Sequence, residues 1–343
     1  MVLLVVPGLW LPAAATAQHE RVWRVRDKLV GKDNKKSVDV SGIACTADTG
    51  FPRSCLVIDD DVQSAQLVTL KDGEIVAGTS IRLTDDRFEG QWLELDGEGV
   101  AYADGFFYVI GSHGHPRDKD RTLDPVRDAA KIRAQIIAAS QVIRLRVDPA
   151  TGRPLTAIGT VSDVPGLART TKLRALILAD PTLAPFADKR LEANGVTIEG
   201  IALRGNRLFA GFRGPVPNDE RAAILSVSLR ALFEEQAPDA TLHLLALGRG
   251  RGVRDLAAFA GGLLVLAGPM ADTGDGRYSV YWWDGMGDTP KLLKDLARYR
   301  EKGIDLKPEA ILPLDRTPAS LRVLVLFDGA KEGGPRAIEV ANP

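Results

Sequence analysis

Apolar and polar positions alternate along the chain in short runs, and one combination of these runs is repeated. Each copy has an acidic residue, a short apolar strand, a turn, and a second apolar strand that ends in glycine. The copies begin at Glu98, Glu199, Asp255 and Glu309, and a fainter copy has Ser41 in the acidic position. Repeats at a period of roughly fifty residues are typical of β-propeller blades, which share apolar faces with their neighbours and must close into a ring.

The number of blades depends on one long interval, since the step from Glu98 to Glu199 is about twice as long as the others. Residues 141–161 read as the outer strands of the second blade, with a turn between them. The additional length is therefore assigned to insertions at about 113–140 and 165–191. We predict an all-β propeller of five blades, with six as the alternative, and a helical insertion after the inner strands of the second blade.

The N-terminal region leads to two expectations. Residues 1–17 form an apolar run with a small-x-small ending, which is typical of a signal peptide cleaved before Gln18. The run is too short and too rich in proline for a membrane span. Residues 18–343 then form one propeller domain, periplasmic or secreted. The alternating segment Arg21–Val30 is expected to pair with the C-terminal segment and complete the last blade.

The two cysteines agree with export. Cys45 and Cys55 lie ten residues apart, on the two strands of one expected hairpin. A disulfide across this hairpin stabilises the fold by about 2–3 kcal/mol in the chain-entropy model and is favoured in an oxidising compartment. Two buried free thiols are the alternative.

The balance of positive and negative residues indicates which classes of partner to expect. The chain has 44 Lys and Arg against 45 Asp and Glu, for a net charge of −1. Nucleic-acid-binding proteins usually present a basic surface, so no nucleic-acid partner is expected. A small anionic ligand remains compatible with this balance, because a few local charges are enough to hold it.

Blade geometry gathers polar residues at one mouth of the central channel. The innermost strand lines the channel and the next strand runs back antiparallel to it, so the start of the first and the end of the second share a face. The second strands end in Asp59–Asp61, His113 with His115, Arg213, and Asp328 with Lys331.

The repeated acids are the candidate metal ligands. Carboxylates that converge on one axis repel one another, so either their pKa values rise or a cation holds them together. Rings of oxygen atoms suit calcium or another divalent cation, and the candidates are Glu98, Glu199, Asp255 and Glu309. The alternative is that each acid accepts backbone N–H bonds from the adjacent blade. No organic cofactor is expected.

The remaining polar residues suggest catalytic and substrate-binding roles. His113 and His115 are two apart on an extended segment and point the same way, which suits an acid or a base. A polar entry into the insertion is the alternative reading. Arg213 and Lys331, beside Asp328, are candidates to hold a carboxylate or phosphoryl group, with the arginine binding bidentately and the lysine as a point charge.

The segments SGIAC, EGVAY, IEGIAL with GFRGP, and LFDGAKEGG resemble an uncharacterised bacterial family, the domain-of-unknown-function family 3616. That family is similar to the esterase-like phytase propellers, which share the Glu-Gly strand starts. The resemblance implies a propeller and, more loosely, a secreted hydrolase of phosphate or other esters. It implies no particular catalytic residues.

Two functions of different class follow. The first is an exported propeller whose acidic mouth binds a metal and a small anionic ligand and hydrolyses a phosphate or carboxylic ester. The second is a non-catalytic periplasmic scaffold that holds an unidentified protein or another ligand at the same mouth. A glycosidase is a third reading and requires two acids about 5–10 Å apart.

Overall fold

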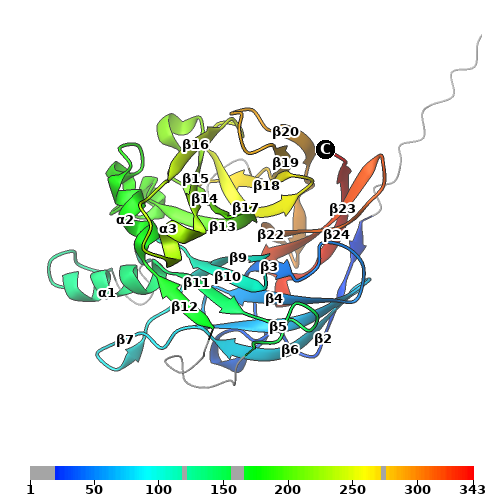
Figure 1. Ribbon diagram of the computed structural model, residues 1–343, viewed down its shortest axis with the longest axis horizontal. Helices are drawn as coiled ribbons and strands as arrows, with labels where there is room; N and C mark the ends of the chain where they lie inside the picture. The colour runs from blue at the N-terminus through cyan, green and yellow to red at the C-terminus, as the bar shows by residue number, and fades with distance from the viewer. Residues whose placement is uncertain (1–19, 118–121, 156–165, 272–275) are drawn as a thin grey trace, which may run out of the picture.

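The computed structural model describes residues 20–117, 122–155, 166–271 and 276–343. The expected signal peptide, residues 1–17, lies outside the described residues. The described chain forms five small sheets arranged in a ring (Figure 1). The prediction of a five-bladed propeller is therefore confirmed.

The first two blades contain the N-terminal half of the chain. Blade one comprises β2 (Arg24–Arg26), β3 (Val40–Cys45), β4 (Arg53–Asp59), β5 (Ser64–Lys71) and β6 (Glu74–Arg82). A small hairpin, β7 (Arg87–Phe88) and β8 (Gln91–Trp92), leads to blade two, which comprises β9 (Gly97–Ala103), β10 (Phe106–Gly111), β11 (Val142–Arg146) and β12 (Leu167–Thr170).

The other three blades follow in chain order. Blade three comprises β13 (Thr197–Arg204), β14 (Arg207–Gly214), β15 (Ala222–Ser228) and β16 (Thr241–Leu245). Blade four comprises β17 (Arg251–Phe259), β18 (Gly262–Pro269), β19 (Ser279–Trp283) and β20 (Lys291–Asp295). Blade five comprises β1 (Arg21–Val22), β21 (Tyr299–Glu301), β22 (Ile304–Arg316), β23 (Ser320–Asp328) and β24 (Arg336–Ala341).

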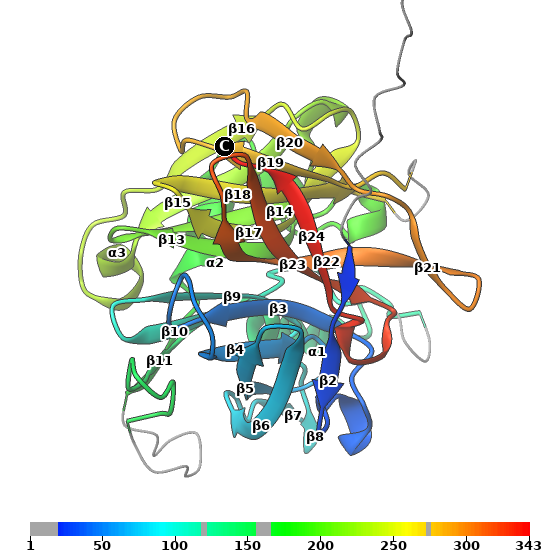
Figure 2. The ribbon, with the colours of Figure 1, turned by 90° about the vertical axis from the view of Figure 1, so that its right-hand side faces the viewer.

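The N-terminal segment closes the ring, but it serves two blades. Arg21 of β1 pairs with Ala337 of β24, as the sequence predicted, and the two strands lie side by side in Figure 2. After the buried Trp23, β2 crosses to blade one and pairs in parallel with β6. The segment therefore joins the first and last blades directly.

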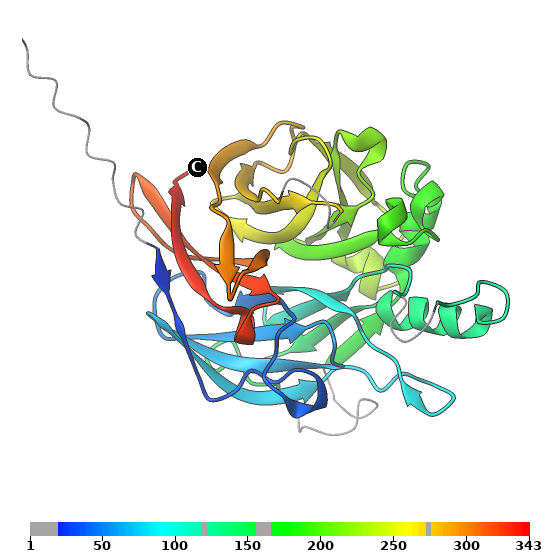
Figure 3. The same cartoon turned by 180° about the vertical axis from the view of Figure 1, so that it is seen from behind.

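The insertions contain the helices α1 (Ala129–Ala139) and α2 (Lys172–Ala179), while the short α3 (Leu229–Phe233) follows β15. Helix α1 projects from the ring, as Figures 1 and 3 show. The predicted outer strands of blade two need a correction, because the outermost strand is β12 rather than a segment before residue 161. Residues 156–165 lie outside the described residues.

The apolar core is divided among the blade interfaces. Five clusters of buried side chains each combine residues of two adjacent blades; one, for example, joins Ile110 of blade two to Ile201 of blade three. The inner strands β3, β9, β13, β17 and β22 contact one another in that order around the ring. Each blade therefore buries its faces only when the ring is closed.

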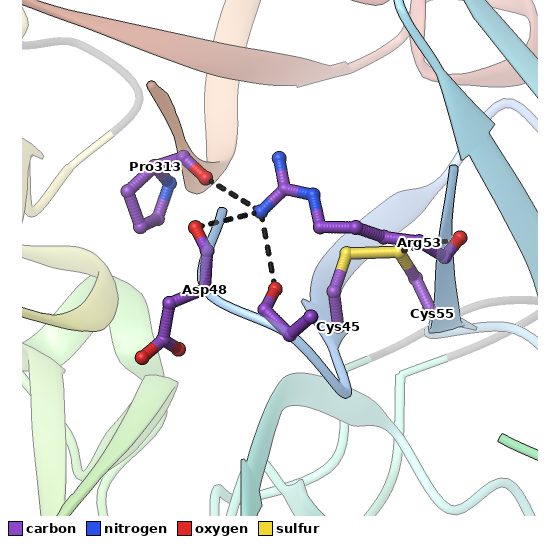
Figure 4. The surroundings of a disulfide bond; sticks show 6 residues. Cys45, Asp48, Arg53, Cys55 and Pro313 are labelled. Atoms are coloured by element: carbon purple, nitrogen blue, oxygen red, sulfur yellow. Dashed lines mark hydrogen bonds between the residues drawn. A yellow bond between two sulfur atoms is a disulfide. The ribbon is translucent and has the colours of Figure 1, made fainter. Parts of the chain in front are cut away.

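The predicted disulfide is present. Cys45 and Cys55 pair across β3 and β4 and are joined by a bond between their sulfur atoms (Figure 4). Beside them, the buried Arg53 donates through Nη1 to the carbonyl oxygens of Ala47, Asp48 and Pro313, at 3.2, 3.0 and 3.1 Å. Since Pro313 belongs to blade five, Arg53 ties the disulfide hairpin to the neighbouring blade.

Candidate functional site

Each inner strand has a β-bulge at the same place in the repeat. Its pairing with the second strand skips one residue, and such bulges redirect a side chain away from the regular pattern. The skipped residues are Ser41, Glu98, Glu199, Arg254 and Glu309.

Blade four therefore differs from the sequence-based alignment. The residue equivalent to the glutamates is Arg254, and Asp255 occupies the position that is glycine at Gly99 and Gly200. The alignment of the repeats in the sequence is wrong by one residue in blade four, because it matched Asp255 to the glutamates by its acidic side chain. An alignment anchored on the apolar-Ala pair that follows, Val100-Ala101 in blade two and Leu256-Ala257 in blade four, finds the correct register.

Arg254 neutralises two of the predicted metal ligands. Its side chain is fully buried, its Nε lies 2.9 Å from Glu199 Oε2, and its Nη2 donates to Glu309 Oε1. Arg213 approaches Glu199 from the other side, with Nη1 donating to Oε1 at 2.9 Å. Two buried carboxylates are therefore matched by two guanidinium groups, and this part of the ring needs no added cation.

Asp255 is held by backbone groups. Its two carboxyl oxygens accept hydrogen bonds from the N–H of Leu256 and from the N–H of Ile311 in blade five, both at 2.7 Å. Burial raises the pKa of this carboxyl well above its usual range. The arrangement matches the alternative interpretation of the sequence, in which an acid links one blade to the backbone of the next.

A cavity of about 260 Å³ lies at this mouth of the channel, between blades one and two and the base of α1. We call it the acidic cavity, because five carboxylates line it. The polar and charged side chains of its wall are Asp39, Asp60, Asp61, Glu94, Asp96, Ser112, His115, Arg117, Gln135 and Thr197.

Two groups of carboxylates at this mouth are spaced closely enough to share a cation. One oxygen each of Asp60, Asp96 and Glu98 lies within 4.8 Å of the others, and the same holds for Asp39, Asp60 and Asp61. Of the four predicted metal ligands, only Glu98 belongs to either group within the described part of the chain.

Glu98 is the distinctive member of the first group. Its side chain is 6% exposed, yet its carboxyl accepts no hydrogen bond and forms no ion pair with a described residue. Burial, together with the charges of Asp96, Glu199 and Asp60, raises the pKa of Glu98 well above its usual range. Burial and the charges of Asp96 and Asp39 likewise raise the pKa of Asp60 to about 9.

The two histidines are separated by the structure. His115 lines the acidic cavity, whereas His113 is fully buried and its Nε2 has no hydrogen-bond partner among the described residues. Nδ1 of His113 lies 2.9 Å from the carbonyl oxygen of Gly111. Burial lowers the pKa of His113 to about 4, so the ring is neutral at pH 7.

The predicted substrate-binding residues are also not gathered into one cavity. Arg213 is engaged by Glu199 and by the carbonyl oxygen of Met270, Asp328 lies 3.6 Å from Lys307 Nζ, and Lys331 is exposed. Sequence reasoning missed Asp96 and Arg254. The first of these was detectable, because Asp96 stands two residues before Glu98 at the entry to the same inner strand.

The fold and this mouth define a five-bladed β-propeller with a carboxylate-rich cavity at one end of its channel. The chain belongs to the family of proteins of unknown function DUF3616, whose sequence model matches residues 39–337. No curated protein matches the chain. Among the described residues, no helix combines the length and apolar character needed to cross a membrane.

Several solved structures are similar to the chain at a low level. The α-L-arabinofuranosidase PaAbf62A from Podospora anserina is 10% identical, with a TM-score of 0.43 over 94% of this chain and 98% of that chain. Hydrazine synthase from Kuenenia stuttgartiensis is 10% identical, with a TM-score of 0.39 over 85% of this chain and 57% of that chain. An endo-arabinanase from Bacillus licheniformis is 9% identical, with a TM-score of 0.35 over 91% and 96%. Similarities this low carry no argument about activity.

Proposed function

We propose that the acidic cavity binds a divalent cation, with Ca²⁺ as the first candidate, through Asp60, Asp96 and Glu98. The observation that carries this proposal is the buried carboxyl of Glu98, which forms no hydrogen bond or ion pair with a described residue and has an oxygen within 4.8 Å of oxygens of Asp60 and Asp96. Burying a charged group is costly unless it is paired. A hard cation with oxygen ligands supplies that pairing.

The cation then attracts the anionic group of a small ligand. An acidic cavity repels anions, but a bound divalent ion is often the largest local charge and reverses the local preference. Arg117 lines the same cavity and adds a second positive charge, and His115, which also lines it, is the residue that we propose exchanges a proton with a bound ligand. A cation that polarises an ester oxygen supports hydrolysis, so the reaction class we propose is hydrolysis of a phosphate or carboxylic ester.

Binding without turnover is the second candidate. One observation favours it, namely that the ring of His113 is buried and does not line the acidic cavity. Of the two histidines proposed for proton transfer, His115 alone is at the cavity wall. In this case the same cation site serves to hold the ligand or an exported partner protein.

Titration calorimetry of EDTA-treated protein with calcium and magnesium chloride tests the cation site. We expect stoichiometric binding by the wild type and a loss of about tenfold or more in affinity for Glu98→Gln. Glu309→Gln is the matched control, because Glu309 occupies the same bulge position but is held by Arg254. Unchanged calcium binding in Glu98→Gln contradicts the proposal.

A screen of phosphate and carboxylic esters, in EDTA and in excess calcium, separates the two candidate functions. Turnover that requires the cation and falls in Glu98→Gln supports the hydrolase. Calcium binding with no turnover on any ester supports the binding protein.

We also propose that the protein functions outside the cytoplasm. The disulfide between Cys45 and Cys55 supports this, because oxidising compartments favour such bonds. Cell fractionation of the full chain, with thiol labelling of the recovered protein, tests it. Recovery in the cytoplasm with two reactive thiols contradicts it.

A further inference from the structure

A second cavity, of about 60 Å³, lies at the opposite end of the channel from the acidic cavity. The acidic cavity lies where the inner strands begin, whereas this one is lined by residues near the ends of β3, β9, β13, β17 and β22, one strand from each blade. We call it the apolar cavity, because small and aliphatic side chains make up most of its wall, among them Ala44, Ala101, Ala202, Ala257 and Leu312. One water molecule needs about 10–15 Å³ of cavity space, so the apolar cavity has room for a molecule of a few heavy atoms.

One buried cation, Arg53, lies on the wall of the apolar cavity. It is 2% exposed, and its Nε and Nη2 atoms are buried without a hydrogen-bond partner. Among the described residues no carboxylate forms an ion pair with it, and Nη1 alone donates, to the three carbonyl oxygens described above. Buried polar atoms without a partner are rare in proteins, and an ion or another ligand is one explanation for them.

The charges nearest to Arg53 do not neutralise it. Asp315 is bound by Arg322, whose Nε lies 3.1 and 3.2 Å from its two carboxyl oxygens. Asp48 is exposed, and Figure 4 shows its carboxyl group directed away from the guanidinium. The ring of Phe51, whose centre is 5.2 Å from Cζ of Arg53, adds a cation–π contact but no negative charge. Since a buried charge is costly unless it is paired, this wall is suited to an anion.

We infer that the apolar cavity binds a short aliphatic carboxylic acid in its ionised form, with the carboxylate at Arg53 and the alkyl chain among the alanines of the inner strands. Guanidinium groups bind carboxylates bidentately, and Nε with Nη2 forms one edge that suits this geometry. Because both nitrogens are covered in this structure, the Arg53 side chain turns toward the cavity when the carboxylate binds. The wall offers few other polar groups, so it does not replace the hydration shell of an inorganic anion.

This inference goes beyond the proposed function and does not rest on it. The acidic and apolar cavities share no described wall residue and lie at opposite ends of the channel. Each contains one buried charge without an ion-pair partner among the described residues, namely Glu98 in contact with the acidic cavity and Arg53 at the apolar cavity. The two ends of the channel therefore differ in the sign of the ligand that they favour.

The test is a ligand-observed NMR titration of the purified protein with sodium acetate, propionate and butyrate at low ionic strength. We expect the wild type to bind all three, with the affinity rising about threefold to fourfold for each added methylene that is buried. Arg53→Met should bind butyrate at least tenfold more weakly. Arg316→Met is the matched control, because Arg316 lies on the same strand as Pro313 but outside the cavity wall.

Two further variants keep Arg53 in place, because Arg53→Met also removes the hydrogen bonds to three carbonyl oxygens. Ala258→Leu narrows the cavity from an exposed position of its wall and should weaken butyrate binding at least tenfold. Asp48→Asn removes the negative charge from the wall and should strengthen butyrate binding about twofold or more. Near-wild-type melting temperatures establish that these variants are folded.

Failure of the wild type to bind any of the three acids overturns the inference, as does equal butyrate binding by the wild type and Ala258→Leu. Equal affinity for acetate and butyrate, or displacement of butyrate by an equal concentration of chloride, overturns the assignment of an aliphatic acid. Calcium binding without carboxylate binding overturns this inference and leaves the proposed function standing. Carboxylate binding by a protein that binds no cation overturns only the proposed function.

Discussion

The Nε atom of Arg254 lies 2.9 Å from Oε2 of Glu199, inside the ring of bulged residues. The same guanidinium contacts Glu309 in the next blade. One buried cation thus connects three consecutive blades, and it divides the repeated acids into two groups. Glu199 and Glu309 are neutralised by the protein, and Glu98 lies beside Asp60 and Asp96 of the acidic cavity.

Replacing Arg254 by methionine is expected to destabilise the fold by about 3–5 kcal/mol, because it leaves the buried carboxylate of Glu309 without its partner and removes one of the two guanidinium groups at Glu199. Urea unfolding measures this loss. Arg300→Met is the control, since Arg300 pairs with Asp305 at an exposed site, where such pairs contribute only about 0–1 kcal/mol. Equal losses in the two variants contradict the role assigned to Arg254.

The close approach of inner strands at Gly200 gives a second prediction. A Cβ at Gly200 would lie 2.5 Å from the Cα of Asp255 in the next blade. Gly200→Ala therefore forces blades three and four apart, and overpacking of this kind costs typically about 1–3 kcal/mol. Thermal unfolding measures the effect, and Gly287→Ala, where a Cβ meets no atom within 4 Å, is the control. A melting temperature as high as that of the control would show that the blades adjust freely.

Removal of the disulfide tests how far the hairpin depends on it. The double variant Cys45→Ser, Cys55→Ser is expected to lose about 2–3 kcal/mol, because the bond closes a loop of ten residues and restricts the unfolded chain. Denaturant titrations with and without a reductant measure this. The reductant should weaken the wild type and leave the double variant unchanged. A reductant effect of equal size in both proteins would point to another cause.

The acidic cavity makes stability depend on pH when no cation is present. The pKa of Asp60 is raised from 3.8 to about 9, so the folded protein holds this proton more tightly than the unfolded chain does. The stabilising contribution is therefore complete below about pH 4 and is lost as the pH rises through about 9. In EDTA, urea midpoints of the wild type should fall over this interval more steeply than those of Asp60→Asn. Parallel slopes in the two proteins contradict the assignment.

Calcium affinity should change in the opposite direction. A cation binds the ionised carboxylates and must displace the protons of Asp60 and Glu98, so its affinity rises with pH. Calorimetry between pH 5 and pH 8 is the measurement, and binding should release protons in a buffer-dependent manner. Affinity that is independent of pH would show that the cation binds elsewhere.

The order of the blades follows from the chain itself. The period of the repeat, the helix at Lys172–Ala179 and the pairing of Cys45 with Cys55 are all set by local patterns, and the structure has them in place. The outermost strand of blade two, Leu167–Thr170, was missed because its four residues acquire their strand character by pairing with β11. A short, half-buried strand has little pattern of its own.

For the candidate site, too, some features follow from the sequence and others only from the tertiary structure. The sequence by itself determined that polar residues from every blade gather at one mouth, because alternating strand directions return each second strand to the start of the first. Only the tertiary structure decided which of them remain available. Asp255 bonds to the backbone of blade five, Glu199 and Glu309 are neutralised by Arg254, and Glu98 lies beside Asp60 and Asp96. The reason is physical, since the partner of a buried charge is fixed by distances of a few ångströms between blades, and those distances exist only when the ring is closed.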